Sequence, residues 1–193
     1  MNIAEQKRQN NIAEYIIHIY QTEDLIRAFD FDMEQIKQYV LKHITHEGVD
    51  QEELTYWYAD LLSQMKKEGI EKEGHLNFAQ TYVEELIVLK SKLIESDDDF
   101  TSKYDKAKPH IEEMLKLSQG KVKSDIQLCL NAVYGLLLTR IQGREVPEEM
   151  KESLELFGDV LSYLSYKYKQ ENFLNENWAL NPKNDTMYNV FIG

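Results

Sequence analysis

The stretch Ser124–Gln142, SDIQLCLNAVYGLLLTRIQ, decides the fold class. Apolar side chains occupy nearly every face of a helix built on these residues, which is typical of a helix surrounded by other helices. Gln127, Asn131 and Gly135 interrupt the apolar run, which is well short of the roughly 20 residues that cross a bilayer. Ser124 followed three residues later by Gln127 predicts a capped start. We therefore expect a buried helix in the middle of an all-α bundle.

The rest of the chain also carries apolar residues at helical spacing, and no useful length alternates with the period of a strand. Asp32, Asp50 and the acidic run Asp97–Asp99 are expected to begin helices, because side-chain oxygens cap free backbone amides there. We expect one domain of six or seven helices over residues 1–170, with an irregular tail over 171–193. The expected helices cover residues 4–29, 32–47, 50–69, 75–94, 97–115 with a kink or break at Pro109, 124–143 and 147–170.

The composition limits the classes of function. The 193 residues include 34 acidic and 22 basic side chains, a net charge of −12, which argues against a sequence-independent grip on nucleic acid or acidic lipid. We expect no nucleic-acid partner and no membrane partner. The first ten residues run directly into a charged helical pattern, so we expect neither a signal peptide nor a lipoprotein start. The expected location is therefore cytoplasmic.

Three segments resemble a known protein family: Ile12–Phe29, Gly74–Leu76 and Ser124–Gln142. They are similar to an all-helical domain-of-unknown-function family found mainly in Bacteroidetes bacteria. The resemblance covers about residues 1–170, and its most specific part is the pattern Glu23-Asp24-x-x-Arg27. It implies an all-α, cytosolic bacterial protein with no assigned activity.

The sequence contains no motif for a cofactor, a metal or a nucleophile. Helix-bundle di-iron sites use Glu-x-x-His pairs, and none of the five histidines has a glutamate three residues before it. Gly69 and Gly74 have the spacing of a phosphate-binding loop, but His75 and Leu76 follow where a lysine and a hydroxyl residue are needed. Cys129 lies in the most apolar helix and is expected to be a small core residue. We expect no catalytic residue, no cofactor and no metal.

Three charged side chains fall on apolar helix faces: Glu23, Lys90 and Arg140. A buried lone charge costs several kcal/mol, so each needs a partner. We expect Glu23 to pair with Arg140 across helices, or with Arg27 one turn along its own helix. Two interpretations remain open. The one we favour is a satisfied ion pair that fixes helix register, and the other is a ligand-binding polar pocket of Glu23, Arg27, Lys90 and Arg140.

A weaker candidate for anion binding precedes the apolar helix. Lys121 and Lys123 lead into Ser124, where free backbone amides favour negative charge. A solvated loop followed by an ordinary helix cap is the simpler interpretation, and we favour it.

The tail ends in the apolar segment Met187–Ile192. We expect it to dock either on its own bundle or on a second copy, where it would support a homodimer. The leading hypothesis is a protein that acts through contacts with other proteins, as a homo-oligomer or as an adaptor for an unknown protein partner. The alternative is a small-molecule or anion-binding protein, possibly an enzyme, that uses the polar cluster. Closed ion pairs would favour the first hypothesis, and a cleft exposing the charges would favour the second.

Overall fold

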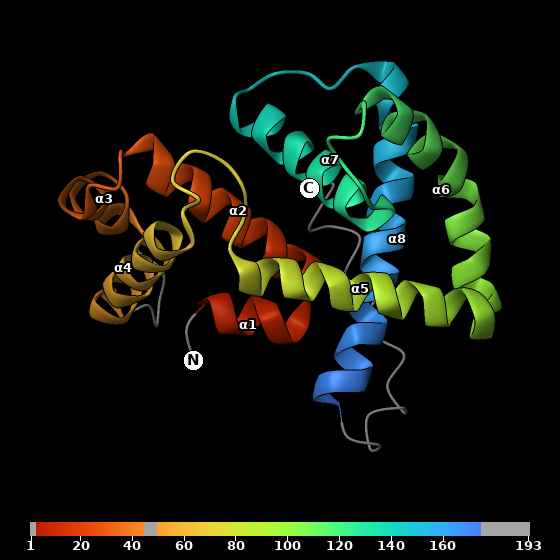
Figure 1. The fold of residues 1–193 in the computed structure, drawn as a ribbon, viewed down its shortest axis with the longest axis horizontal. Helices are drawn as coiled ribbons and strands as arrows, with labels where there is room; N and C mark the ends of the chain where they lie inside the picture. Colours follow the sequence, from red (N-terminus) through yellow and green to blue (C-terminus); the bar gives the residue numbers. More distant parts are fainter. Residues whose placement is uncertain (1–2, 45–49, 175–193) are drawn as a thin grey trace. The chain divides into compact units, whose positions relative to one another are not determined.

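The computed structural model describes residues 3–44 and 50–174. These residues form helices joined by turns, and no strand occurs among them, so the all-α prediction is confirmed (Figure 1). The helices in chain order are α1 (Ile3–Asn10), α2 (Ile12–Ala28), α3 (Met33–Tyr39), a short 3₁₀ helix η1 (Leu41–His43), α4 (Gln51–Glu68), α5 (Asn77–Ser96), α6 (Asp98–Leu117), α7 (Asp125–Ile141) and α8 (Glu148–Phe173).

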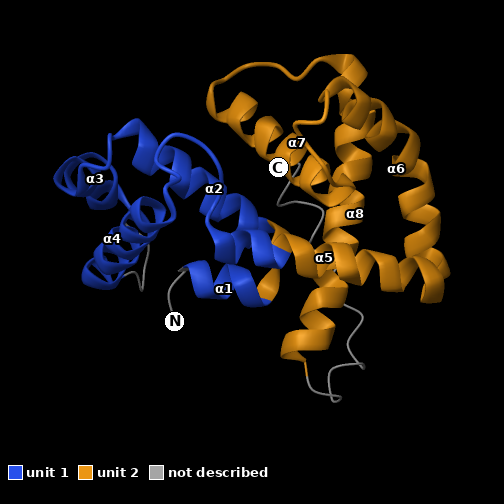
Figure 2. Cartoon of the chain, in the orientation of Figure 1, with its two compact units in different colours: residues 1–9, 14–82 blue, residues 10–13, 83–193 orange. Residues whose placement is uncertain are grey.

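The chain divides into two compact units (Figure 2). Unit 1 comprises residues 1–9 and 14–82, and unit 2 comprises residues 10–13 and 83–193. Two helices, α2 and α5, therefore contribute residues to both units.

The core of unit 1 is built on α2. Ile16, Ile19, Tyr20 and Ile26 of this helix are fully buried. Ring stacking on Tyr20 and hydrogen bonds to Glu23 add to the apolar contacts. The other helices of the unit supply buried side chains to the same core, namely Ile36 from α3, Leu41 from η1, Tyr58, Leu61 and Met65 from α4, and Ala79 from α5.

The core of unit 2 is built where α6, α7 and α8 pack together. The first half of α7 is buried, as its apolar sequence predicts, and its side chains include Ile126, Cys129 and Val133. Its second half is more open, and Ile141 at its end is 61% exposed. From α8 the core takes Leu154, Phe157, Val160, Leu161 and Leu164.

Capping side chains begin four of the helices, as predicted from the sequence. Asp32, Asp50, Asp97 and Ser124 each accept a hydrogen bond from a backbone N–H of the first turn of α3, α4, α6 and α7. These amides have no partner within their own helix, so each cap satisfies a donor that would otherwise be free.

Three helix boundaries differ from the prediction. The segment 4–29 is two helices, with a break at the buried residue Asn11. The segment 32–47 stops as an α-helix at Tyr39 and continues only as η1. Residues 98–117 form one helix that runs through Pro109 without ending there. Smaller shifts occur at α5, which begins at Asn77, and at α8, which continues to Phe173.

The break at Asn11 has a tertiary cause within unit 2. The N–H of Ala13, in the first turn of α2, donates to the hydroxyl of the buried Ser165 on α8 at 3.2 Å. A continuous helix would direct this amide to a carbonyl four residues earlier instead. Apolar spacing continues across the break, so the sequence pattern alone does not reveal it.

We predict that Ser165→Ala lowers the free energy of unfolding by about 1–3 kcal/mol, because the buried N–H of Ala13 loses its acceptor. Urea denaturation of the full chain measures this. The matched control is Ser91→Ala, since the exposed hydroxyl of Ser91 bonds only to a carbonyl of its own helix. Equal stability changes in the two variants would contradict the assignment.

Candidate functional site

The carboxylate of Glu23 is the centre of a polar cluster in unit 1. Its side chain projects from α2 and is fully buried, as its position on the apolar face predicts. Oε1 accepts the backbone N–H of Leu76 at 2.8 Å, and Oε2 lies 2.7 Å from Nδ1 of His75. The carbonyl of Leu76 then accepts the first hydrogen bonds of α5, from Ala79 and Gln80. One buried carboxylate thus fixes the residue at which α5 starts.

Arg27, one turn along α2, holds the same loop. Its Nη2 donates to the carbonyl of Ile70 at 3.1 Å and to that of Gly74 at 2.5 Å, while Nη1 pairs with Asp24 at 2.9 Å. Its buried Nε has no hydrogen-bond partner within the part of the chain that the structure describes. Arg27 therefore attaches the loop to α2, and most of its guanidinium N–H groups donate to the protein itself.

The prediction that Glu23 pairs with Arg140 or Arg27 was wrong. Its carboxylate bonds to His75 and to the backbone of Leu76, rather than to Arg27 or Arg140. The physical reason is that a loop approaches the buried face of α2, and helix periodicity does not show the path of a loop. A backbone N–H is also a donor that no residue pattern displays.

Two glycines allow the loop to reach α2. Gly69 ends α4 with φ 70°, and Gly74 has φ 94°. Both values lie in the left-handed region that glycine adopts readily. A Cβ on Gly74 would also lie 3.4 Å from Cγ2 of Ile70. The segments Glu23-Asp24-x-x-Arg27 and Gly74–Leu76 therefore contact each other in the fold.

His75 completes the cluster and is partly exposed. Its side chain is 29% exposed, and its ring stacks on that of Tyr20 with centroids 3.6 Å apart. Nδ1 of His75 and Oε2 of Glu23 share one hydrogen bond of 2.7 Å. The hydroxyl of Tyr20 accepts from Gln80 at 3.0 Å. This arrangement orients one imidazole, and within the described ranges no group of three His, Cys, Asp or Glu side chains could hold a metal.

A second closed polar group lies in unit 2. Nζ of Lys90 is 2.7 Å from Oδ2 of Asp125, and the Tyr104 hydroxyl donates to the same oxygen. Burial by itself would raise the pKa of Asp125, but the bonds from Lys90 and Tyr104 outweigh it and hold that pKa below its usual value. Lys90 thus has a carboxylate partner on α7, which helix periodicity alone does not indicate.

Arg140 is exposed on α7, contrary to the expectation that it lies on a buried face. The reason is that only the first half of α7 is covered within unit 2. Of the four residues proposed as a ligand pocket, Glu23 and Arg27 bind one loop in unit 1. Lys90 forms an ion pair with Asp125 in unit 2. Arg140 also belongs to unit 2.

At the candidate anion site, Lys121 and Lys123 are exposed and Ser124 caps α7 through the N–H of Gln127. Asp125 follows at once, and its Oδ1 accepts the N–H of Ile126 at 2.8 Å. A protein carboxylate therefore already supplies negative charge at this helix end. This arrangement favours the helix-cap interpretation over an anion site.

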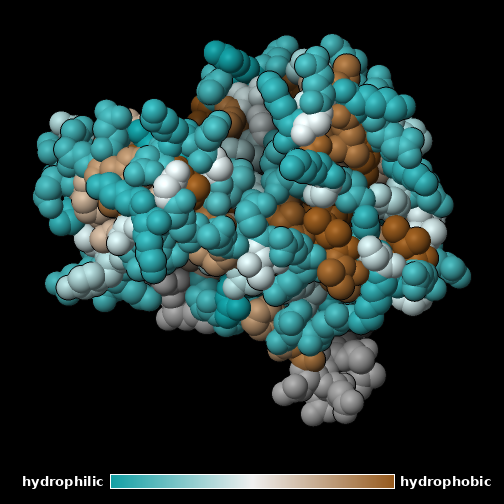
Figure 3. Space-filling view, in the orientation of Figure 1, coloured by the Kyte–Doolittle hydropathy of each residue, from teal (hydrophilic) through white to brown (hydrophobic). Residues whose placement is uncertain are grey.

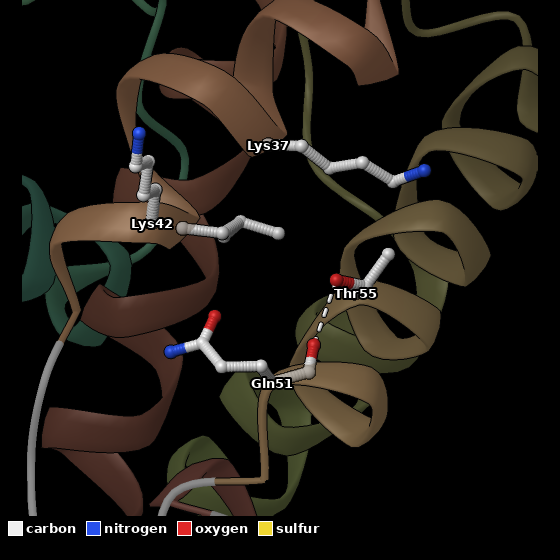
Figure 4. Close-up of a pocket in the computed structure, with 5 residues that line it drawn as sticks. Lys37, Lys42, Gln51 and Thr55 are labelled. Atoms are coloured by element: carbon white, nitrogen blue, oxygen red, sulfur yellow. Dashed lines mark hydrogen bonds between the residues drawn. The ribbon is translucent and has the colours of Figure 1, made fainter.

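A cavity of about 430 Å³ opens in unit 1 between η1 and α4 (Figure 4). Its lining residues are Lys37, Leu41, Lys42, Gln51 and Thr55. The polar atoms of α4 there are bonded within the protein, since Thr55 donates to the carbonyl of Gln51 at 2.7 Å and Gln51 Nε2 donates to that of Ile44 at 2.7 Å. The volume is in the range of small-molecule sites, about 300–1,000 Å³. The sequence does not reveal this cavity, because no residue pattern shows that η1 and α4 lie together.

The ring of His18 stacks on Trp57 in unit 1, with centroids 5.4 Å apart and planes within 5°. Burial lowers the pKa of His18 to about 4, with a smaller contribution in the same direction from Lys7. The imidazole is therefore neutral at pH 7 and serves as an aromatic packing residue.

We predict that Glu23→Ala lowers the free energy of unfolding by about 3 kcal/mol, because it leaves the buried N–H of Leu76 without an acceptor. Glu23→Gln keeps the side-chain shape and one acceptor oxygen, so its loss is expected to be about 1 kcal/mol. Chemical denaturation at pH 7 compares the two. Unchanged stability in both variants would show that Glu23 does not hold the loop.

We also predict a contribution of His18 to acid sensitivity. Its pKa is about 4 in the folded protein, against about 6.5 in an unfolded chain. The unfolded state therefore binds the proton first, so stability is fully present above pH 6.5 and falls between pH 6.5 and pH 4 by up to about 1.4 kcal/mol per pH unit. His18→Phe keeps a ring against Trp57 and should flatten this slope in denaturation series from pH 7 to pH 4. An unchanged slope would contradict the assignment.

Within the described ranges, no helix is long and apolar enough to cross a membrane. The model of a protein family described as a domain of unknown function, DUF4924, matches residues 1–174. This match includes both segments of the cluster around Glu23 and all of the described helices. No curated protein and no solved structure matches the chain.

Proposed function

The chain belongs to the DUF4924 family, and we propose that it acts through contacts with other proteins, as a homo-oligomer or as an adaptor. The observation that carries the proposal is an apolar face on α5 that unit 2 leaves uncovered. Val88 is 70% exposed and Ile94 is 38% exposed, and Ile87 beside them is half-buried. Figure 3 shows hydrophobic residues gathered over α5.

The spacing of this α5 face suits a partner helix or surface. Ile87 and Ile94 share a face of the helix because they are seven residues apart, and Val88 lies at the edge of that face. Ser91 is three or four residues from each of these three side chains, so it lies among them on the helix surface, and its small side chain allows close approach. Exposed large apolar side chains that cluster in this way are typical of interaction sites.

The closed polar clusters support the same proposal. Glu23 and Asp125 have their hydrogen-bonding atoms occupied by protein donors. A site that binds a polar ligand would instead present such groups to solvent or to a cavity. The buried charges therefore act in folding, and the exposed apolar residues are left as the groups available for binding.

The charge of the chain determines how self-association should respond to salt. Two copies with a net charge of −12 repel each other, and salt screens that repulsion. Association through the α5 face should therefore strengthen as salt rises. A homodimer through the segment 187–192 remains part of the proposal, although those residues lie outside the described ones. We place this activity in the cytoplasm, as expected from the sequence.

A second candidate function is the binding of a small acidic molecule. The cavity favours it, since two basic residues, Lys37 and Lys42, and the apolar Leu41 line one space of suitable volume. Lys37 already pairs with Glu34 at 3.0 Å. A ligand there would have to compete with that carboxylate, so we rank this function second.

We predict that sedimentation velocity of the full chain at about 100 μM shows a dimer that strengthens from 20 to 500 mM NaCl. Val88→Asp should abolish it, because it places a charge on the α5 face. Leu117→Asp, which adds the same charge at a residue that is 73% exposed on α6, is the matched control. Phe191→Asp tests the tail in the same series.

A monomer at every protein and salt concentration would contradict the homo-oligomer form of the proposal. Dissociation by Phe191→Asp alone would assign the contact to the tail rather than to α5. A dimer that weakens with salt would show that charge pairs, and not the apolar face, hold the copies together.

A further inference from the structure

The turn between α2 and α3 adopts an unusual backbone conformation. Asp30 has φ 50° and Phe31 has φ 60°, two consecutive residues other than glycine in the left-handed region. The N–H of Phe31 donates to the carbonyl of Ile26 at 3.0 Å, and that of Asp30 to the carbonyl of Arg27 at 3.0 Å. This is a common way to end a helix, but the left-handed position is usually glycine. A bulky residue there is a genuine outlier.

Backbone strain of this kind persists only where the surrounding structure holds it, and it concentrates at functional sites. Glycine at residue 31 would relieve the strain and would remove the aromatic ring. Phe31 thus places an aromatic ring at a position where glycine would be unstrained. This points to a role for the ring that a relaxed turn would not provide.

The turn presents aromatic rings at the surface of unit 1. Phe29 stacks against Tyr39, with centroids 6.5 Å apart and planes within 15°, and Tyr39 is 58% exposed. Nζ of Lys66 lies 5.5 Å from the ring centroid of Phe31. We call Phe29, Asp30, Phe31 and Tyr39 together the aromatic turn.

The charges near these rings favour a cationic partner. Asp30 lies within the aromatic turn and is exposed. Asp32 and Glu34, which follow it, are also exposed, but Asp32 caps α3 and Glu34 pairs with Lys37, so Asp30 is the carboxylate assigned to the partner. The ammonium of Lys66 shows that the face of Phe31 already accepts a cation. Arginine binds aromatic faces through its planar guanidinium and pairs with carboxylates at the same time. The net charge of −12 adds a long-range attraction for basic chains.

We propose that the aromatic turn is a docking surface for an arginine-containing basic segment of a partner protein, with guanidinium groups over the rings and paired with Asp30. Lys66 occupies the face of Phe31 until the partner's cation displaces it. The inference shares with the proposed function the assumption of a protein contact. It uses a different surface from the α5 face, so either assignment can fail without the other.

The test is titration of the full, ¹⁵N-labelled chain with an acetylated and amidated hexa-arginine peptide at 150 mM NaCl, with calorimetry for the affinity. Shift changes should centre on residues 29–39 and on Lys66. Tyr39→Leu and Phe31→Leu should each weaken binding at least fivefold, because both remove a ring and keep apolar volume. Tyr56→Leu is the matched control, since Tyr56 is 75% exposed on α4, and it should change the affinity less than twofold.

Two further arms make the result specific. Hexa-lysine should bind more weakly than hexa-arginine, because an ammonium lacks the planar stacking surface. Lys66→Ala should tighten binding at least twofold, because it removes the competing cation. If Phe31→Leu fails to fold, Tyr39→Leu still tests the surface.

Several outcomes would overturn the assignment. Shift changes spread over all acidic surfaces, or an equal effect of Tyr56→Leu, would show non-specific attraction to a negative protein. Equal affinity for hexa-lysine would show that the rings take no part. Shift changes centred on residues 84–95 would place the basic segment on the α5 face and would leave the proposed function intact.

Discussion

The buried carboxylate of Glu23 is the interaction on which the organisation of unit 1 depends. A carboxylate out of water is tolerated only when hydrogen bonds replace its hydration, and His75 with the N–H of Leu76 does this. The same hydrogen bonds also hold the loop between α4 and α5 against α2. Arg27 strengthens the same attachment through two loop carbonyls. The first residue of α5 is thereby set by a side chain more than fifty positions earlier.

The fold class followed from the sequence because helix periodicity and capping residues are local signals. Asp32 and Ser124 begin helices as predicted, and the burial of Glu23 followed from its position among isoleucines. Its partner did not follow, since a backbone N–H carries no residue signature and a loop has no periodicity. The break at Asn11 was not predicted for a related reason: the hydrogen bond that stabilises it comes from Ser165, which lies 152 residues after Ala13 in the sequence.

The candidate site was predictable only in part. Lys90 lies where its charge needs a partner, and it has one in Asp125, but sequence spacing could not choose that residue among the many acids of the chain. The cavity beside Lys37 depends on how η1 meets α4, which is a tertiary property. Buried charged residues and exposed apolar residues therefore have different roles in this protein. The buried charged residues bond to loops and helices of the protein itself. The two contact surfaces that we propose, on α5 and at the aromatic turn, consist of apolar and aromatic side chains.

The most direct test of this account is the amide hydrogen exchange rate of Leu76. Its N–H is bonded to a fully buried carboxylate, although it lies just outside the hydrogen-bonded body of α5. The account predicts that this amide exchanges as slowly as those in the centre of α2, and that Glu23→Ala brings it to the rate of an open loop. Exchange of Leu76 in the unmodified chain as fast as that of the exposed residues 71–73 would contradict it.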